Sequence, residues 1–191
     1  MPNYRRRRVP GGTYFFTVNL ADPGDCTLCL EIDLLRECYA KTQQECPFRT
    51  DAIVILPNHL HAIWTLPPDD TDYSGRWRRL KGRFSHALRR KGNRSASAVS
   101  KREAGIWQRR FWEHTIRDAD DLHRHLAYCW FDPVRHGLVH DPADWAFSSF
   151  TKRHEHLKSD LMPPMRFDVG ERGERKQDRK QSPSPVAAVR S

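Results

Sequence analysis

The sequence predicts an α+β domain of the ferredoxin-like type, in which a split β-α-β arrangement packs helices on one face of an antiparallel sheet. Two kinds of sequence pattern predict this fold. Some segments alternate apolar and polar residues with the period of a strand, and others repeat apolar residues with helical spacing. They follow one another as β-α-β-β-α-β, and one extra helix comes last. The second face of the sheet is expected to stay open for chemistry.

The first strand is predicted over residues 13–20, because large apolar residues alternate there with threonine and asparagine after Gly11-Gly12. A helix is predicted over residues 28–46, where apolar residues share one face and Pro47 closes the segment. Residues 51–56 and 59–66 are predicted to form two antiparallel strands, since Pro57-Asn58 between them is typical of a turn.

A second helix is predicted from Trp77 to Leu88, with a basic face opposite its apolar one. Residues 92–98 are expected to form a flexible connector before a strand over residues 107–116. The third helix is predicted over residues 120–133, because Asp118 and its acidic neighbours supply N-cap chemistry and Pro133 ends or kinks it.

The chain has 191 residues, enough for one catalytic domain over residues 1–150 with a basic N-terminal arm. Residues 151–191 have the charged, apolar-poor composition of a disordered tail. We expect a cytoplasmic, nucleoid-associated protein without a membrane partner, since no apolar run approaches the roughly 20 residues of a spanning helix and no signal peptide is evident.

The net charge of +9 and the sequence pI of about 9.6 favour a polyanionic partner. Charge alone does not separate DNA from RNA, and solvated faces or a disordered arm would also explain basic runs. The residues expected to contact DNA are Arg5, Arg6, Arg7, Arg8, Lys81, Arg83, Arg109 and Arg110. The odd number of cysteines, five, favours reduced thiols, and only Cys26 and Cys29 have zinc-like spacing, which disfavours structural zinc.

His59 and His61 are the strongest candidates for metal ligands. Separated by one residue on a strand, their imidazoles project from the same face, about 6.6 Å apart along the chain. A lone His-x-His pair is weak evidence of a metal site, because ten histidines produce such pairs by chance. The pair therefore needs a third ligand.

The third helix supplies that ligand and a nucleophile. With 100° per residue, Leu122, Leu126 and Cys129 define an apolar stripe, whereas Tyr128 lies nearly opposite, towards solvent or a site. Asp132 follows one turn later on the face of Tyr128, and Pro133 is expected to aim its carboxylate outwards. Two imidazoles and a carboxylate suit Mg²⁺ or Mn²⁺, with zinc as a rival. An ordinary exposed tyrosine and a surface carboxylate are the alternatives.

At these residues the sequence resembles the REP-associated tyrosine transposases, a bacterial branch of the HUH single-tyrosine transposases related to the IS200-like enzymes. The similar stretches are YRR from Tyr4, PGGTYFFTVN from Pro10, LPNHLHAIW from Leu56, WQRRFWEHTIRD from Trp107, YxxxDPVRHGLV from Tyr128 and WAFSSF from Trp145. They occur in order over residues 4–150, which is more specific than any one motif.

The resemblance implies that His59 and His61 form the metal pair and that Tyr128 is the nucleophile. Asp132 stands where the family usually has asparagine, which keeps an oxygen ligand but adds a negative charge. Members of the family cleave and rejoin single-stranded DNA near REP palindromes, which are short repeated hairpins. The resemblance also implies a 5′-phosphotyrosine intermediate, a base-reading role for the arm from Arg5 to Arg8, and a monomer acting in cis rather than a homodimer.

Tyrosine has a pKa near 10, so the site must remove its proton, for which His125 is a candidate acceptor besides a bound water or the metal. A replication-initiator or relaxase-type nickase would use the same chemistry, although those proteins commonly carry further domains. A domesticated protein that only binds hairpin DNA or RNA is the non-enzymatic alternative. Nicking of oligonucleotides with Mg²⁺ or Mn²⁺ distinguishes the enzyme from the binder.

Overall fold

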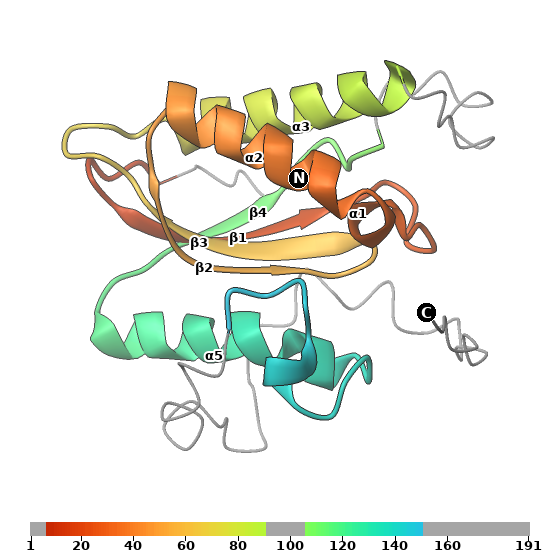
Figure 1. Cartoon of the computed structure of the whole chain (residues 1–191). Helices are drawn as coiled ribbons and strands as arrows, with labels where there is room; N and C mark the ends of the chain where they lie inside the picture. The colour runs from red at the N-terminus through yellow and green to blue at the C-terminus, as the bar shows by residue number, and fades with distance from the viewer. Residues whose placement is uncertain (1–6, 91–105, 151–191) are drawn as a thin grey trace, which may run out of the picture.

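The computed structural model describes residues 7–90 and 106–150 (Figure 1). Four strands form one antiparallel sheet in the order β2-β3-β1-β4. They are β1 (Thr13–Asn19), β2 (Arg49–Ile55), β3 (His59–Thr65) and β4 (Trp112–Thr115). Because β3 lies between β1 and β2, the predicted split β-α-β arrangement is confirmed. The expected arm at Arg5 and Arg6, the connector at 92–98 and the tail at 151–191 lie outside the described residues.

The helices are α1 (Thr27–Leu30), α2 (Ile32–Glu45), α3 (Tyr73–Arg90) and α5 (Ala119–Arg135), with a short 3-10 turn, η1 (Pro142–Asp144). The helix predicted over residues 28–46 is therefore two helices, which Glu31 separates with φ −113° and ψ 36°. The strand predicted over residues 107–116 is shorter, and Trp107 makes only an isolated bridge to Leu20. In the described part of the chain, no helix has the length and apolar character needed to cross a bilayer.

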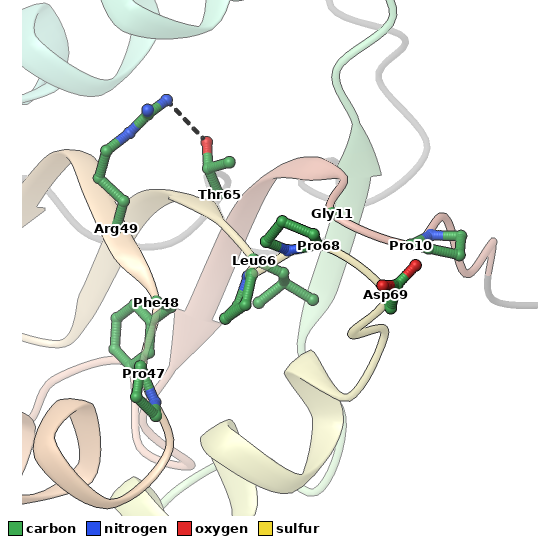
Figure 2. Close-up of a pocket in the computed structure, with 10 residues that line it drawn as sticks. Pro10, Gly11, Pro47, Phe48, Arg49, Thr65, Leu66, Pro68 and Asp69 are labelled. Atoms are coloured by element: carbon green, nitrogen blue, oxygen red, sulfur yellow. Dashed lines mark hydrogen bonds between the residues drawn. The ribbon is translucent and has the colours of Figure 1, made fainter.

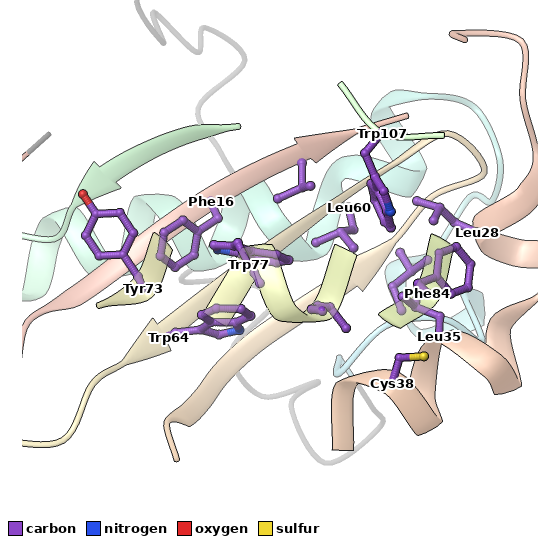
Figure 3. Close-up of a cluster of buried hydrophobic side chains, with 14 of the residues drawn as sticks. Phe16, Leu28, Leu35, Cys38, Leu60, Trp64, Tyr73, Trp77, Phe84 and Trp107 are labelled. Carbon is purple, nitrogen blue, oxygen red and sulfur yellow. The ribbon is translucent and has the colours of Figure 1, made fainter. Parts of the chain in front are cut away.

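α2 and α3 cover one face of the sheet, as predicted (Figure 1). An aromatic core fills the space between these two helices and the sheet. Its centre is the stacked pair Trp64 and Trp77, whose ring centroids lie 4.1 Å apart. Phe16 from β1 and Tyr73 from α3 extend this cluster (Figure 3). The alternation of apolar residues that predicted β1 therefore reports the face that packs against α2 and α3.

α5 covers the opposite face, which the sequence predicted to stay open (Figure 1). That prediction was wrong because this face also carries apolar residues, including Phe15, Val54 and Ile63, which must be buried. Trp130 of α5 donates from Nε1 to Ser149 Oγ at 2.9 Å, and the chain around Ser148 bridges Val54 of β2. α5 is thus held between the sheet and the segment that follows it.

α5 begins at its predicted cap, where the Asp118 side chain accepts a hydrogen bond from the backbone N–H of Asp121 at 2.7 Å. It does not end at Pro133 but continues to Arg135, and Gly137 follows with a φ of 66°. A proline this close to a helix end removes only one backbone hydrogen bond, so packing outweighs the cost. This continuation keeps Asp132 within the helix and facing the sheet.

Candidate nucleophile and metal centre

The candidate centre lies where the start of β3 meets the C-terminal half of α5. His59 and His61 point to the face of the sheet that α5 covers, as their shared parity predicts. His61 is 1% exposed, and Thr17 of β1 pairs with it in register. The sheet thus fixes the backbone of both histidines through neighbouring strands.

Second partners orient both imidazole rings. His61 Nδ1 lies 2.9 Å from Thr17 Oγ1, and His59 Nδ1 lies 2.7 Å from Asn58 Oδ1. The Asn58 amide donates to the carbonyl of Pro23, so its oxygen is the atom that faces His59. Because an amide oxygen only accepts, His59 Nδ1 carries the proton of that bond. In both rings Nε2 is therefore the atom directed into the centre.

Both Nε2 atoms converge on one carboxylate oxygen. Asp132 Oδ2 lies 3.2 Å from His59 Nε2 and 3.1 Å from His61 Nε2. Asp132 is 1% exposed, so the prediction that its carboxylate points outwards was wrong; Pro133 does not turn it out because the helix continues. Burial raises the pKa of Asp132, but the positive charge of His61 and hydrogen bonds from His59 and His61 outweigh it and hold this pKa well below its usual range.

The donor atoms fit a divalent cation. His59 carries its proton on Nδ1, so in the neutral ring the lone pair of Nε2 faces the Asp132 carboxylate, which can only accept. This contact is favourable only if the ring gains a second proton or if a cation lies between the two groups. The Nε2 of His136 lies 3.6 Å from the same Asp132 oxygen, and His59, Asp132 and His136 have ligand atoms close enough to share one ion. Two or three imidazoles and a carboxylate thus form a candidate metal site.

Tyr128 lies beside this site. Its ring packs edge-on against His61, with centroids 5.1 Å apart, and against Phe15, at 5.7 Å. Only 8% of Tyr128 is exposed, which excludes the ordinary exposed tyrosine that periodicity left open. The face of α5 that carries Tyr128 is buried because it packs over the histidines. Leu122 and Leu126, which belong to the predicted apolar stripe, are only partly buried.

Two residues of the centre were missed by sequence reasoning. The guanidinium of Arg135 lies 4.5 Å from the centre of the Tyr128 ring, and its Nη1 lies 3.5 Å from Asp132 Oδ1. His136 adds the further imidazole described above. Helical spacing could have indicated Arg135, since it lies one turn after Asp132 and two turns after Tyr128 on the same face. It was missed because the helix was predicted to stop at Pro133.

His125 belongs to a neighbouring cluster. Its Nδ1 donates to the backbone carbonyl of Asp121 at 2.7 Å, which leaves Nε2 as the basic nitrogen. Burial, together with the nearby charges of His114 and Arg124, lowers the pKa of His125, against the opposing effect of Asp121. His125 contacts Phe15, with ring centroids 4.9 Å apart, and Phe15 in turn contacts Tyr128.

The basic residues expected to contact DNA lie in different places. Arg7, Arg8, Arg109 and Arg110 are exposed. Lys81 donates to the backbone carbonyl of Gln108 and Arg83 bonds Thr42 and Glu45, so both have intramolecular partners on the α2 and α3 side of the sheet. DNA contact by these two residues stays a prediction.

A hollow of about 700 Å³ lies at the far end of β3 (Figure 2). It is lined by residues that include Phe48, Arg49, Thr65 and Pro68. Thr65 ends the strand that His59 begins, so this hollow is separated from the imidazoles by the length of β3. None of the residues that line the hollow belongs to the candidate centre.

A histidine pair on a central strand beside a helix that carries a tyrosine agrees with the HUH-type arrangement that the sequence resemblance implies. No family model matches the chain. The chain is 41% identical over 163 residues to the REP-associated tyrosine transposase of Escherichia coli strain K12, covering 85% of this chain and 89% of that protein. It is 43% identical over 164 residues to a Haemophilus influenzae relative described by the same family term, covering 85% and 92%.

A solved structure described as a REP-associated tyrosine transposase bound to a REP hairpin superposes with a TM-score of 0.69 at 41% identity. It covers 85% of this chain and 89% of that one. The chain therefore belongs to the family of REP-associated tyrosine transposases.

Proposed function

We propose that this protein cleaves and rejoins single-stranded DNA at REP-type hairpins through a 5′-phosphotyrosine on Tyr128. The observation that supports this most strongly is the contact between the Tyr128 ring and the His61 ring. The Nε2 atoms of His61 and His59 both lie close to the same Asp132 oxygen. A nucleophile and three hard or borderline ligand groups within one buried cluster support phosphoryl transfer. Family membership and the hairpin bound to the related structure support the substrate.

In the forward step the Tyr128 oxygen forms a bond to the phosphorus, and the bond from phosphorus to the 3′-oxygen breaks. The phenol loses its proton and the leaving oxygen gains one, so the products are a 5′-phosphotyrosine and a free 3′-hydroxyl. Attack by another 3′-hydroxyl on that link regenerates the phenol and joins two strands. No nucleotide triphosphate is required, because the number of phosphoester bonds is unchanged.

Mg²⁺ or Mn²⁺ is the proposed cofactor, held by His59, His61 and Asp132 with His136 as a further ligand. Imidazole donors favour Mn²⁺ over Mg²⁺, which prefers an all-oxygen shell. When bound, such an ion would offset negative charge that grows on the phosphate oxygens. Thr17 and Asn58 hold the imidazoles in the ligand orientation.

Two residues around Tyr128 assist it in this proposal. His125 is a candidate acceptor of the phenol proton, because its lowered pKa favours the neutral ring and its Nδ1 proton is held by Asp121, which leaves Nε2 free of a proton. The Arg135 guanidinium over the phenol ring would stabilise negative charge on the phenolate or the phosphate. Exposed Arg7, Arg8, Arg109 and Arg110 supply phosphate contacts, and the protein acts as a monomer in cis.

Cleavage of end-labelled oligonucleotides that carry the host genome's repeat hairpins tests the function. We expect wild-type protein with Mn²⁺ or Mg²⁺ to cleave, and Y128F to lose cleavage while it still binds the hairpin. Y39F is the matched control, because it removes one tyrosine hydroxyl on the α2 side of the sheet, where Tyr39 bonds Thr50 and Trp64. Hairpin binding without cleavage by any wild-type preparation would instead indicate a non-catalytic binder.

Mixing tests the oligomeric assignment. Y128F and H61A each lack one part of the centre, so a cis monomer stays inactive when the two variants are combined. Restored cleavage would show that one chain supplies the tyrosine and another the histidines. Sedimentation of the wild-type protein gives an independent reading, for which we expect a monomer.

A further inference from the structure

Trp112 is a large aromatic side chain that folding leaves accessible. It is 44% exposed, whereas most tryptophans of the described chain are buried. It lies on β4 directly opposite Thr17 of β1, and Thr17 also pairs with His61 of β3. Residues paired across adjacent strands share one face, so Trp112 and His61 lie on the same face of the sheet, about 10 Å apart across two strand spacings.

Other aromatic rings support Trp112 in a fixed orientation. Trp112 is nearly parallel to His114, with centroids 6.0 Å apart and an interplanar angle of 12°, and His114 stacks on His125 at 4.5 Å and 15°. Phe15 packs edge-on against Trp112 at 5.8 Å. His114 Nε2 lies 2.8 Å from Asp121 Oδ2, which anchors the middle ring of this ladder. The ladder is therefore ordered before any ligand arrives.

Two exposed guanidinium groups belong to the same cluster as the ladder. Arg117 and Arg124 both bond the buried Asp121 carboxylate, yet their side chains remain 59% and 58% exposed. Asp118 also acts on Arg117, so the charges of these four side chains balance, and the two exposed guanidinium groups are the cationic groups that a phosphate can reach. His114, Asp121 and His125 are also close enough to share a metal ion, but the two guanidinium groups already neutralise Asp121 and would repel a cation. The two exposed guanidinium groups can instead bind a phosphate.

The buried ring of Phe15 connects the ladder to the candidate centre. Phe15 contacts Trp112 and His125 on one side, and Tyr128 and His61 on the other, where its ring lies 5.3 Å from His61. Because Phe15 contacts both Tyr128 and Trp112, a strand with a phosphate at Tyr128 would have its neighbouring nucleotide within reach of Trp112. Trp112 is linked to Arg117 and Arg124 through His114 and Asp121, and an exposed indole together with guanidinium groups can bind unpaired bases and their phosphates.

We propose that Trp112 is a stacking platform for one unpaired nucleotide that adjoins the cleaved phosphate, with Arg117 and Arg124 binding the backbone phosphate beside that base. The inference rests on the proposed function in taking DNA as the ligand. It adds a positioning site: the stacked base fixes the register of the strand, and hence which phosphate lies at Tyr128. Stacking tolerates any base, so the site selects unpaired over paired DNA.

Binding measurements in the Y128F background test this without cleavage. Fluorescence anisotropy compares a hairpin with unpaired flanks and a hairpin with none. We expect W112A to weaken binding of the flanked hairpin by about 5- to 150-fold and to leave the blunt hairpin unaffected. W112F should retain most of the affinity because it keeps a ring. L30A is the matched control, since Leu30 is 79% exposed on α1, on the other side of the sheet.

Abasic substitution along the flank identifies the stacked nucleotide. We expect removal of one base to weaken binding to wild-type Trp112 but not to W112A, so that the two losses are not additive at that position alone. Additive losses at every position, or equal binding by W112A and wild type, would overturn the proposal. A change in oligomeric state upon W112A with DNA binding intact would assign the patch to a protein contact instead. Failure of every variant to bind any hairpin would refute the proposed function itself.

Discussion

The two faces of the sheet are packed in opposite ways. Between the sheet and α3, Trp64 and Trp77 stack at the centre of an aromatic core. Between the sheet and α5, the buried groups include an imidazole and two carboxylates, from His61, Asp121 and Asp132. Burying ionisable groups costs free energy unless partners neutralise them, whereas burying aromatic rings stabilises the fold directly. One face therefore supplies stability and the other can hold groups chosen for chemistry.

Truncation at the centre of the aromatic face should have the largest effect on stability. We expect W77A to lower the free energy of unfolding by about 3–5 kcal/mol, since Trp77 is 0% exposed and a cavity remains. Urea denaturation followed by circular dichroism measures it. L122A on the opposite face should cost less, because Leu122 is only partly buried. Equal losses would contradict the division of roles between the faces.

The pH dependence of stability tests the role of the buried Asp121 carboxylate on the α5 side of the sheet. Burial raises its pKa, but hydrogen bonds from Arg117 and His114 outweigh this and lower it. A lowered folded pKa means that the stabilisation is complete above the unfolded pKa of about 4 and decreases as the pH falls below it. We expect D121N to cost about 2–3 kcal/mol at pH 7, in EDTA, and less at pH 2.

Urea denaturation at both pH values measures this difference. D33N is the control, because Asp33 is 93% exposed beside Arg36 and its removal should change stability little at either pH. A D121N deficit that stays constant from pH 7 to pH 2 would show that the Asp121 charge is not the source of the effect.

Thr17 tests whether the imidazoles are held ready for an ion. T17V removes the partner of His61 Nδ1, so we expect the affinity for Mn²⁺ to fall about 10- to 100-fold in calorimetric titration. T13V is matched to it, since Thr13 lies on the same strand and face but bonds Thr65 at 2.8 Å, away from the centre. Unchanged affinity in T17V, or equal losses in both variants, would remove Thr17 from the site.

His136 should have the smallest effect. Its side chain is 49% exposed and lies 3.6 Å from Asp132, farther than the other two imidazoles. We expect H136A to weaken Mn²⁺ binding by less than about tenfold, because a water can replace an exposed ligand. A loss equal to that of H61A would make His136 a principal ligand.

Much of the fold could be predicted from the sequence. The alternation in β1 and the turn at Pro57-Asn58 report local preferences, and the order of elements along the chain matched the split β-α-β motif that the sheet has. The break at Glu31 was not predictable in this way, since the apolar spacing continues through it. The covering of the second face by α5 was missed because it depends on tertiary burial of Phe15 and Val54.

The candidate centre was only partly predictable. Spacing indicated that His59 and His61 share a face, and the helix phase indicated that Tyr128 and Asp132 do. Neither pattern reveals that the two faces meet, because a contact between residues more than 60 positions apart is set by packing. Arg135 was missed because the sequence rule for proline ended the helix too early, whereas packing around Pro133 sustains it.

In the proposed reaction the phenol oxygen of Tyr128 forms a covalent bond to a DNA phosphate. Mass spectrometry of the peptide that contains Tyr128, after incubation with a hairpin oligonucleotide and Mn²⁺, tests it most directly. We expect this peptide to carry the 5′-phosphorylated fragment and the adduct to be absent from Y128F. An adduct on any other residue, or an adduct that persists in Y128F, would contradict it.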